Sequence, residues 1–244
     1  MSGHSKWATI KRKKAATDAK RGKIFTKLIK ELIIAARDGG GDSDANPRLR
    51  QAISTAKTAN MPNDNINRAI QKGTGELEGI NYEEFTYEGY GPGGVALFME
   101  VLTDNKKRTV SEIRHLMHKY GGNLGENGSV SWMFEKMGQI TISTNGYDED
   151  LVFEESLEAG ADDFSSSDGE YLITTSPSKT VNVSDSLTAK GYAVTSTAVE
   201  MVPKNVMKVE GDDVKRLMVL MEALEENEDI QNLYSNLDVY DEDL

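Results

Sequence analysis

The sequence predicts an α+β protein in which a basic all-helical domain precedes two split-βαβ, ferredoxin-like domains, one inserted in the other. Apolar residues recur at helical spacing up to about residue 75, and beyond that point the period shortens toward 2. The sign of the charge changes at the same place. Residues 1–75 hold 16 Lys and Arg against 6 Asp and Glu, whereas the remainder holds 12 against 34. Such asymmetry favours a polyanionic partner for the basic part.

Three helices are expected in a basic helical domain over residues 1–78. The first spans 24–36, where apolar residues form a broad stripe, and the glycines at 39–41 end it. Asn46-Pro47 supplies an N-cap and a first-turn proline for the second helix, and the third follows Met61-Pro62 and ends at Gly73. The opposite face of the first helix carries Lys23, Lys27, Lys30 and Arg37.

After a Gly-rich linker, the spacing of the apolar residues changes from the helical period of about 3.6 toward the strand period of about 2. Residues 95–102 form a nearly continuous apolar run, which is typical of a strand buried on both faces. A helix with inward residues between Val110 and Tyr120 should follow and end at Gly121-Gly122. Val130, Trp132 and Phe134 then alternate like a half-buried strand.

The next stretch has a βαββαβ order of its own. We expect strands at 139–143, 162–166, 171–175 and 193–202, and helices at 149–159 and 178–189. Ser176-Pro177 resembles a cap and first-turn proline for the second helix.

Further elements follow Pro203: a strand at 206–209, a helix from Asp212 and a last strand near 229–237. The strand, helix and strand expected at 95–134 form only half of an α+β domain, and these later elements supply the other half. We therefore expect a discontinuous α+β domain of residues 79–135 plus 205–244, with residues 136–204 inserted in it.

A chain whose formal net charge is -12 opens with a concentrated basic arm, which contains Lys6, Trp7, Lys11, Arg12, Lys13, Lys14, Lys20, Arg21 and Lys23. Lys and Arg neutralise phosphates and release counterions, and an indole can stack on a base. The alternative is a solvated basic tail with its Trp packed back on the helices. The candidate nucleic-acid contacts are Lys6, Trp7, Lys11, Arg12, Lys13, Lys14, Lys20, Arg21, Lys23, Lys27, Arg48 and Arg50. Lys57, Arg68 and Lys72 could extend this surface, although isolated basic residues on helices are commonly the solvent face.

Other motifs favour structural roles. The Gly-rich run 87–94 lacks the Lys-Ser or Lys-Thr of a phosphate loop and precedes a strand, so we expect a tight turn that packs two domains together. His115 and His118 are interpreted as surface histidines rather than metal ligands. No catalytic triad, carboxylate pair or dinucleotide fingerprint occurs, so we expect no enzyme, cofactor or metal.

The overall composition limits the cellular compartment and the classes of partner that we expect. The chain has no Cys and no run of about 18 apolar residues, which favours a cytoplasmic protein without a membrane span. The acidic clusters of the α+β domains favour solubility, and the alternative is a face that docks on a basic protein.

Seven motifs resemble those of the YebC family, and 231–236 resembles its C-terminal signature. They are Gly3–Trp7, Lys20–Lys27, Ala45–Arg50, Ala59–Pro62, Tyr87–Gly94, Leu102–Asn105 and Gly121–Gly125. The resemblance implies a cytoplasmic, non-enzymatic, three-domain protein described as a DNA-binding transcriptional regulator. A related mitochondrial protein is a translational activator, and bacterial members are linked to ribosome function at difficult sequences. DNA and ribosomal RNA both stay open as partners, because a basic helical surface does not distinguish 2′-hydroxyls.

Overall fold

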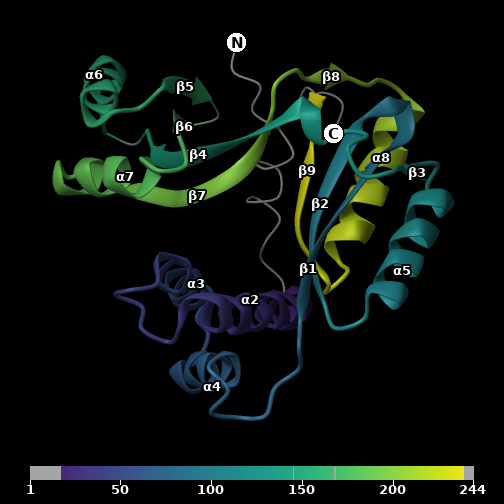
Figure 1. The fold of residues 1–244 in the computed structure, drawn as a ribbon. Helices are drawn as coiled ribbons and strands as arrows, with labels where there is room; N and C mark the ends of the chain where they lie inside the picture. Colours follow the sequence, from purple (N-terminus) through teal and green to yellow (C-terminus); the bar gives the residue numbers. More distant parts are fainter. Residues whose placement is uncertain (1–17, 145, 168, 239–244) are drawn as a thin grey trace. The chain divides into compact units, whose positions relative to one another are not determined.

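The structure is a computed structural model that describes residues 18–144, 146–167 and 169–238 (Figure 1). Its helices and largely antiparallel sheets confirm the predicted α+β class. The described chain folds as two compact units, residues 18–131 with 207–238 and residues 132–206. Among the described residues, no helix is both long and apolar enough to cross a membrane.

Three helices open the first unit: α2 (Asp18–Gly39), α3 (Pro47–Thr58) and α4 (Asn63–Gly73). The predicted cap of α3 is confirmed, since the Asn46 side chain accepts from the backbone N–H of Leu49 at 3.1 Å. Its amide nitrogen donates to the carbonyls of Ala35 at 2.7 Å and Gly40 at 2.8 Å, which holds the turn after α2. The core of the three helices contains Leu32, Ile33, Ala35, Ala36, Leu49, Ala52, Ala56, Met61, Ile66 and Ala69.

The same unit contains a four-stranded antiparallel sheet of order β3-β1-β2-β9. Its strands are β1 (Glu83–Tyr90), β2 (Ala96–Thr103), β3 (Asn123–Leu124) and β9 (Ile230–Ser235). The central strand β2 is buried along nearly its whole length, as its apolar run predicts. Helices α5 (Lys106–Lys119) and α8 (Asp212–Glu225) lie side by side on one face (Figure 1). Their shared core includes Met99, Ile113, Met117, Leu217 and Leu220.

The strands that fill this sheet differ from the expected set. The prediction omitted β1, which pairs with β2 along eight residues and forms a hairpin. The expected strand over 130–134 is wrong, because Ser131–Met133 form a 3₁₀ turn and Phe134 begins a strand of the other sheet. Strand β8 (Met207–Lys208) pairs only with β10 (Leu237–Asp238) within the described residues. Local alternation marks a strand, but pairing across the sheet decides its neighbours.

The Gly-rich run forms the turn between β1 and β2. Gly93 and Gly94 have φ of 72° and 79°, a left-handed region that favours glycine. A Cβ on Gly91 would lie 2.5 Å from Leu217 Cδ1, and one on Gly93 would lie 2.7 Å from Val209 Cγ1. The expected tight turn is confirmed. Within its own unit the turn packs on α8, through Leu217, and on Val209.

The second unit is a ferredoxin-like sheet of order β5-β6-β4-β7, as the βαββαβ order predicts. Its strands are β4 (Phe134–Ser143), β5 (Asp163–Ser167), β6 (Glu170–Thr175) and β7 (Val194–Pro203), and its helices are α6 (Glu149–Ala159) and α7 (Thr180–Ala189). Its core is Ile140, Ile142, Val152, Tyr171, Ile173, Val183, Leu187 and Tyr192.

Two boundaries in this unit differ from expectation. Strand β4 begins at Phe134 rather than near 139, because it pairs with β7 as far as Pro203. The predicted Ser176-Pro177 cap of α7 is wrong, since the helix begins at Thr180. The Thr180 hydroxyl is buried against Gly138 and lies 3.0 Å from the Thr175 hydroxyl, a tertiary contact that sets the helix start.

A buried carboxylate organises the loop that follows β3. Glu88 on β1 is 3% exposed, and its oxygens accept from the backbone N–H of Gly128 at 2.8 Å, Val130 at 2.7 Å and Ser131 at 2.8 Å. Burial raises the pKa of this carboxyl, but these hydrogen bonds outweigh burial and hold its pKa below the ordinary value.

We expect Glu88→Gln to destabilise the protein by about 1–3 kcal/mol, because an amide NH₂ cannot accept and leaves at least one buried N–H unpaired. Urea denaturation measures this loss, and Glu83→Gln on the exposed part of the same strand is the matched control. Because the folded pKa of Glu88 is depressed, its contribution is present above the unfolded pKa and is lost as pH falls through the folded pKa. Equal stability of the two variants would contradict this role.

Candidate nucleic-acid interface

The predicted contacts divide into an arm and a helical surface. Lys6, Trp7, Lys11, Arg12, Lys13 and Lys14 lie outside the described residues. Lys20 and Arg21 belong to the start of α2, and Lys23 and Lys27 follow on the same helix. Arg48 and Arg50 lie on α3.

Lysines 23, 27 and 30 share one stripe of α2 and meet the C-terminal end of α8. Lys23 Nζ lies 3.5 Å from Glu226 Oε2, and Lys27 Nζ donates to the Glu225 carbonyl at 2.7 Å. Cations are favoured at a helix C-terminus, where the carbonyl groups point outward. These lysines therefore have an intramolecular anionic partner in this structure. A phosphate would compete with that partner for Lys23 and Lys27.

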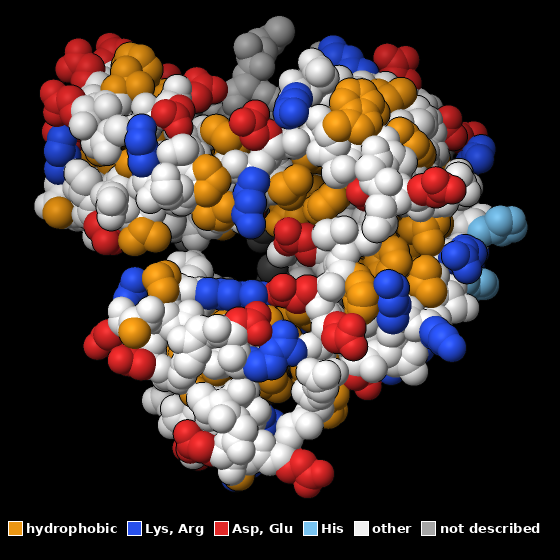
Figure 2. Space-filling view, in the orientation of Figure 1, with side chains coloured by type: hydrophobic (Ala, Val, Ile, Leu, Met, Phe, Trp, Pro, Cys, Tyr) orange, Lys and Arg blue, Asp and Glu red, His pale blue; other side chains and the backbone are white. Residues whose placement is uncertain are grey.

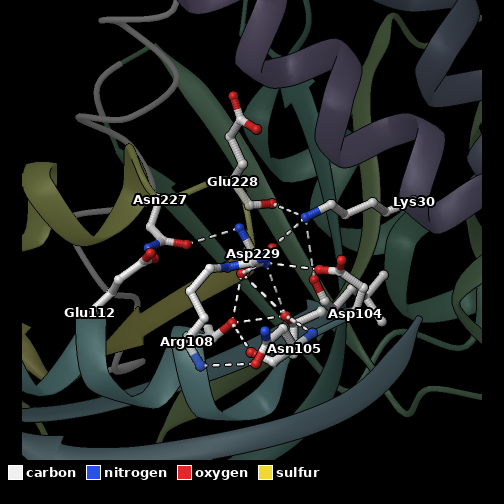
Figure 3. Close-up of polar contacts among 11 residues, drawn as sticks. Lys30, Asp104, Asn105, Arg108, Glu112, Asn227, Glu228 and Asp229 are labelled. Atoms are coloured by element: carbon white, nitrogen blue, oxygen red, sulfur yellow. Dashed lines mark hydrogen bonds and ion pairs between the residues drawn. The ribbon is translucent and has the colours of Figure 1, made fainter. Parts of the chain in front are cut away.

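Lys30 continues this stripe into a buried ion cluster (Figure 3). Lys30 and Asp229 are each 5% exposed, and Lys30 Nζ donates to Asp229 Oδ1 at 2.5 Å. The ammonium also donates to the carbonyls of Glu228 at 3.0 Å and Leu102 at 3.4 Å. Its three protons thus have three acceptors. Lys30 lies on the polar side of α2, as predicted, but at this position that side of the helix is buried instead of exposed to solvent.

Asp229 also collects donors from α5. Its Oδ2 accepts from Arg108 Nη2 at 2.8 Å, Thr109 Oγ1 at 2.6 Å and Thr103 Oγ1 at 3.2 Å. Burial raises the pKa of this carboxyl, but the hydrogen bonds from Arg108, Lys30 and Thr109 prevail and lower it to about 2. The same contact raises the pKa of Arg108. The cluster joins α2, α5 and the segment before β9.

A pocket of about 430 Å³ lies beside the cluster. Two pairs of side chains that line the pocket form hydrogen bonds with each other: Arg108 donates to Asp104 at 2.8 Å, and Asn227 donates to Glu112 at 2.9 Å. These four side chains therefore already have hydrogen-bond partners within the protein.

The two arginines of α3 also have partners on the protein. Arg48 donates to both carboxylate oxygens of Glu31, at 2.7 and 3.0 Å, and to Glu84 at 2.5 Å. These carboxylates raise its pKa. Arg50 donates to the carbonyls of Ser43 at 3.1 Å and Asp44 at 3.2 Å, which ties down the loop between α2 and α3. Both side chains are exposed enough to contact a ligand as well.

Three other basic residues have charges that no partner within the described residues neutralises. Lys57, Arg68 and Lys72 are exposed, and none of them makes an ion pair or side-chain hydrogen bond within the described ranges. Arg68 and Lys72 lie one turn apart on α4, so they share a face of the helix. The sequence marked these three as an extension only, because helical spacing does not tell which cations lack an internal partner.

The charge surplus of the basic region lies mainly in the arm. Residues 1–21 contain seven Lys and Arg and one Asp, whereas residues 22–75 contain nine Lys and Arg and five Asp and Glu. Several of the nine are paired as described above. The helices thus provide a modestly basic platform, and the arm carries most of the charge that a polyanion would meet.

Comparison with known proteins gives consistent matches along the chain. A model of the TACO1/YebC protein N-terminal domain matches residues 5–76, and a model of the TACO1/YebC second and third domain matches residues 82–237. A "probable transcriptional regulatory protein" of Syntrophus aciditrophicus is 56% identical over 99% of this chain and 97% of its own length. A relative of the same description from Geobacter sulfurreducens is 51% identical over 100% of this chain and 98% of its own.

A solved structure has the same fold. The crystal structure of a conserved hypothetical protein from Aquifex aeolicus aligns with a TM-score of 0.88 at 43% identity, covering 97% of this chain and 98% of that one. The resemblance seen in the sequence motifs is confirmed. The chain belongs to the TACO1/YebC family.

Proposed function

We propose that the protein is a non-enzymatic, DNA-binding transcriptional regulator of the cytoplasm, which contacts phosphates through its basic N-terminal helical domain. One observation carries the proposal: the basic residues concentrate in residues 1–75 of a chain that is otherwise strongly acidic. The acidic remainder repels polyanions, so a nucleic acid would meet the arm and the helices first. The names of the relatives as probable transcriptional regulatory proteins support the same role.

The helical platform suits such contacts. Lys57, Arg68 and Lys72 project from α3 and α4 without internal ion pairs in the described chain, and the arm precedes α2 directly. Lys and Arg contacts to phosphates position a protein on DNA, whereas sequence preference requires contacts to base edges or DNA shape. We assign the phosphate contacts to this platform and the arm.

A competition experiment tests the proposal. A duplex enriched from a random pool by the full-length protein is bound at about 150 mM salt, where non-specific affinity alone is weak, and is challenged with its scrambled counterpart. We expect the scrambled duplex to compete at least about tenfold less well. Equal competition would remove the basis for a sequence-preferring regulator.

A second candidate is a translation factor that binds ribosomal RNA, with the acidic units against basic ribosomal proteins. The acidic surface favours it, because complementary charge steers association with basic proteins. In Figure 2 acidic side chains gather over α6. This candidate predicts that the protein co-sediments with ribosomes in a salt-dependent way, and the absence of co-sedimentation at low salt would eliminate it.

A further inference from the structure

Helix α6 presents several large apolar side chains to solvent. Three of the twelve exposed large hydrophobic side chains of the described residues lie on this helix of 11 residues: Leu151, Phe153 and Leu157, each at least 41% exposed. No other helix or strand in the described part of the chain has more than one. Apolar residues scattered singly over a surface are normal, whereas neighbouring ones indicate a surface that contacts a partner.

Phe153 and Leu157 form one apolar stripe of α6. They are four residues apart and therefore lie on the same face of the helix, whereas Leu151 falls on another side. The Phe153 ring packs edge-on against Phe164 of β5, with 5.6 Å between the ring centroids. Strand β5 pairs only with β6 among the described strands, so it lies at an edge of its sheet. The apolar stripe thus lies beside a sheet edge that no further described strand covers.

An acidic stripe runs beside the apolar one. Asp150 and Glu154 are also four residues apart, and the helical period places them next to the apolar stripe on its solvent side. Both carboxylates are exposed, and neither has an ion pair or side-chain hydrogen bond within the described residues. The neighbouring Glu155 and Glu158 differ, since they lie 3.4 and 3.5 Å from Lys190. Two adjacent carboxylates beside the apolar stripe therefore have no cation of the described chain on them.

The charge around the apolar stripe restricts what can cover it. Residues 137–178 contain ten Asp and Glu and no Lys, Arg or His. Figure 2 shows hydrophobic side chains among acidic ones over α6. A nucleic acid or an acidic protein would be repelled by this field. A partner that fits needs apolar side chains for the apolar stripe and cations for the carboxylates next to it.

We propose that this face of α6 docks a basic amphipathic segment of a partner protein. Apolar side chains of the segment cover Phe153 and Leu157, and its Lys or Arg side chains pair with Asp150 and Glu154. Burial of the apolar surface supplies affinity, and the exposed charge pairs steer the encounter. This contact is separate from the proposed binding of DNA by residues 1–75, and it gives a role to an acidic unit that polyanions avoid.

Synthetic peptides test the proposal on the full-length protein. The probe is a fluorescein-labelled peptide of about 16 residues of Lys, Leu and Ala, with Leu at the helical spacing that forms one apolar face. One control peptide has Ser in place of Leu, and another has Glu in place of Lys. At about 150 mM salt, which screens distant charges, we expect the probe to bind at least about tenfold more tightly than the Leu-free peptide. The Glu peptide should not bind. Fluorescence anisotropy measures all three.

Substitutions in the apolar stripe locate the contact. Phe153→Ser with Leu157→Ser should weaken binding of the probe at least about tenfold, because a few buried apolar side chains carry most of the binding energy of an interface. Val181→Ser with Val199→Ser removes exposed apolar side chains from α7 and β7 of the same unit and should leave the affinity unchanged. Circular dichroism and urea denaturation establish that each variant is folded.

Substitutions in the acidic stripe give a second test that does not alter packing. Asp150→Asn with Glu154→Gln should weaken binding about 3- to 10-fold and reduce its salt dependence, because exposed interface charges act mainly on the rate of association. Glu135→Gln with Asp185→Asn is the matched control. These two carboxylates are exposed elsewhere in the same unit, without ion pairs within the described residues, and their removal changes the net charge equally. The control should bind like the parent protein.

Four results would overturn the inference. Equal losses in the α6 variants and their controls would show that the probe responds to overall charge alone, and equal affinity for the Leu-free peptide would show that the apolar stripe contributes nothing. A peptide of residues 1–17 that binds at the stripe more tightly than the probe would assign this face to the basic arm of the chain. Self-association that Phe153→Ser with Leu157→Ser abolishes would assign it to a second copy. None of these results bears on the duplex competition that tests the proposed function.

Discussion

The Asp229→Ala protein should lose about 3–5 kcal/mol of its free energy of unfolding, because removal of one partner leaves a buried charge uncompensated. In this case the uncompensated charge is the ammonium of Lys30, which is 5% exposed and would keep only the two carbonyl contacts. Arg108 would lose a partner as well, but it is more exposed and retains Asp104. A loss of this size is a large fraction of the stability of an ordinary domain.

Urea denaturation at neutral pH measures this effect. Glu210→Ala is the matched control, since Glu210 is exposed and makes no ion pair within the described residues. The double variant Lys30→Met with Asp229→Ala should recover part of the loss, because no charge is then left unpaired at this site. An Asp229→Ala protein as stable as the control would show that the cluster contributes nothing net.

Acidification should expose the same interaction. The pKa of Asp229 is lowered to about 2 in the folded protein, whereas an unfolded Asp titrates near about 3.9. The stabilisation is therefore present above about pH 5 and is lost as the pH falls through 4 toward 2. We expect the stability difference between the parent protein and Asp229→Ala to shrink over that range.

Neutralising the arm should have the largest effect on nucleic-acid binding. Replacing Lys11, Arg12, Lys13 and Lys14 with Ala removes up to four phosphate contacts, which lowers the salt slope of duplex binding by about 3.6 and the affinity by roughly 10²- to 10³-fold near 0.15 M salt. The slope is the sharper measurement, because it counts ionic contacts. Fluorescence anisotropy from 50 to 200 mM salt provides it.

A matched control separates arm contacts from overall charge. Replacing Lys107, Lys119, Lys215 and Arg216 with Ala also removes three Lys and one Arg, and it likewise changes the formal net charge from -12 to -16. These four side chains are exposed on α5 and α8. We expect them to alter the slope by less than one. Similar losses in both variants would show that net charge, rather than the arm, governs binding.

The helices were the most predictable part of the fold. Apolar spacing identified α2, and the Asn46-Pro47 cap of α3 formed as expected. The βαββαβ order of the second unit also emerged from the pattern, with α6 spanning Glu149–Ala159 as predicted. These features depend on neighbours within a few residues, which is the range that a local pattern covers.

The strands of the first sheet were less predictable. The β1–β2 hairpin was missed because β1 ends in a Gly-rich run that reads as a turn, and its pairing partner supplies much of its stability. The turn at Ser131–Met133 was mistaken for a strand because Val130, Trp132 and Phe134 alternate. Alternation of apolar residues does not distinguish a strand from a turn that leads into one.

The candidate contacts depended even more on tertiary structure. The sequence placed Lys23, Lys27 and Lys30 on one polar side of α2, but it did not show that α8 and Asp229 meet that side. It also named Arg48 as a contact and Lys57 only as an extension, although Arg48 has carboxylate partners within the described chain and Lys57 has none there. The exposure of Trp132 was missed for the same reason, since an apolar residue in an alternating run was expected to be half-buried.

Local sequence patterns thus sufficed to predict the α+β class, the existence and order of the helices, and the concentration of positive charge ahead of an acidic remainder. The tertiary structure alone decided which of those charges are neutralised inside the protein and which face solvent. The physical reason is sequence distance. Helical spacing and caps act between residues about four apart, whereas Lys30 meets Asp229 across 199 residues, and only the packing of the folded chain brings such a pair together.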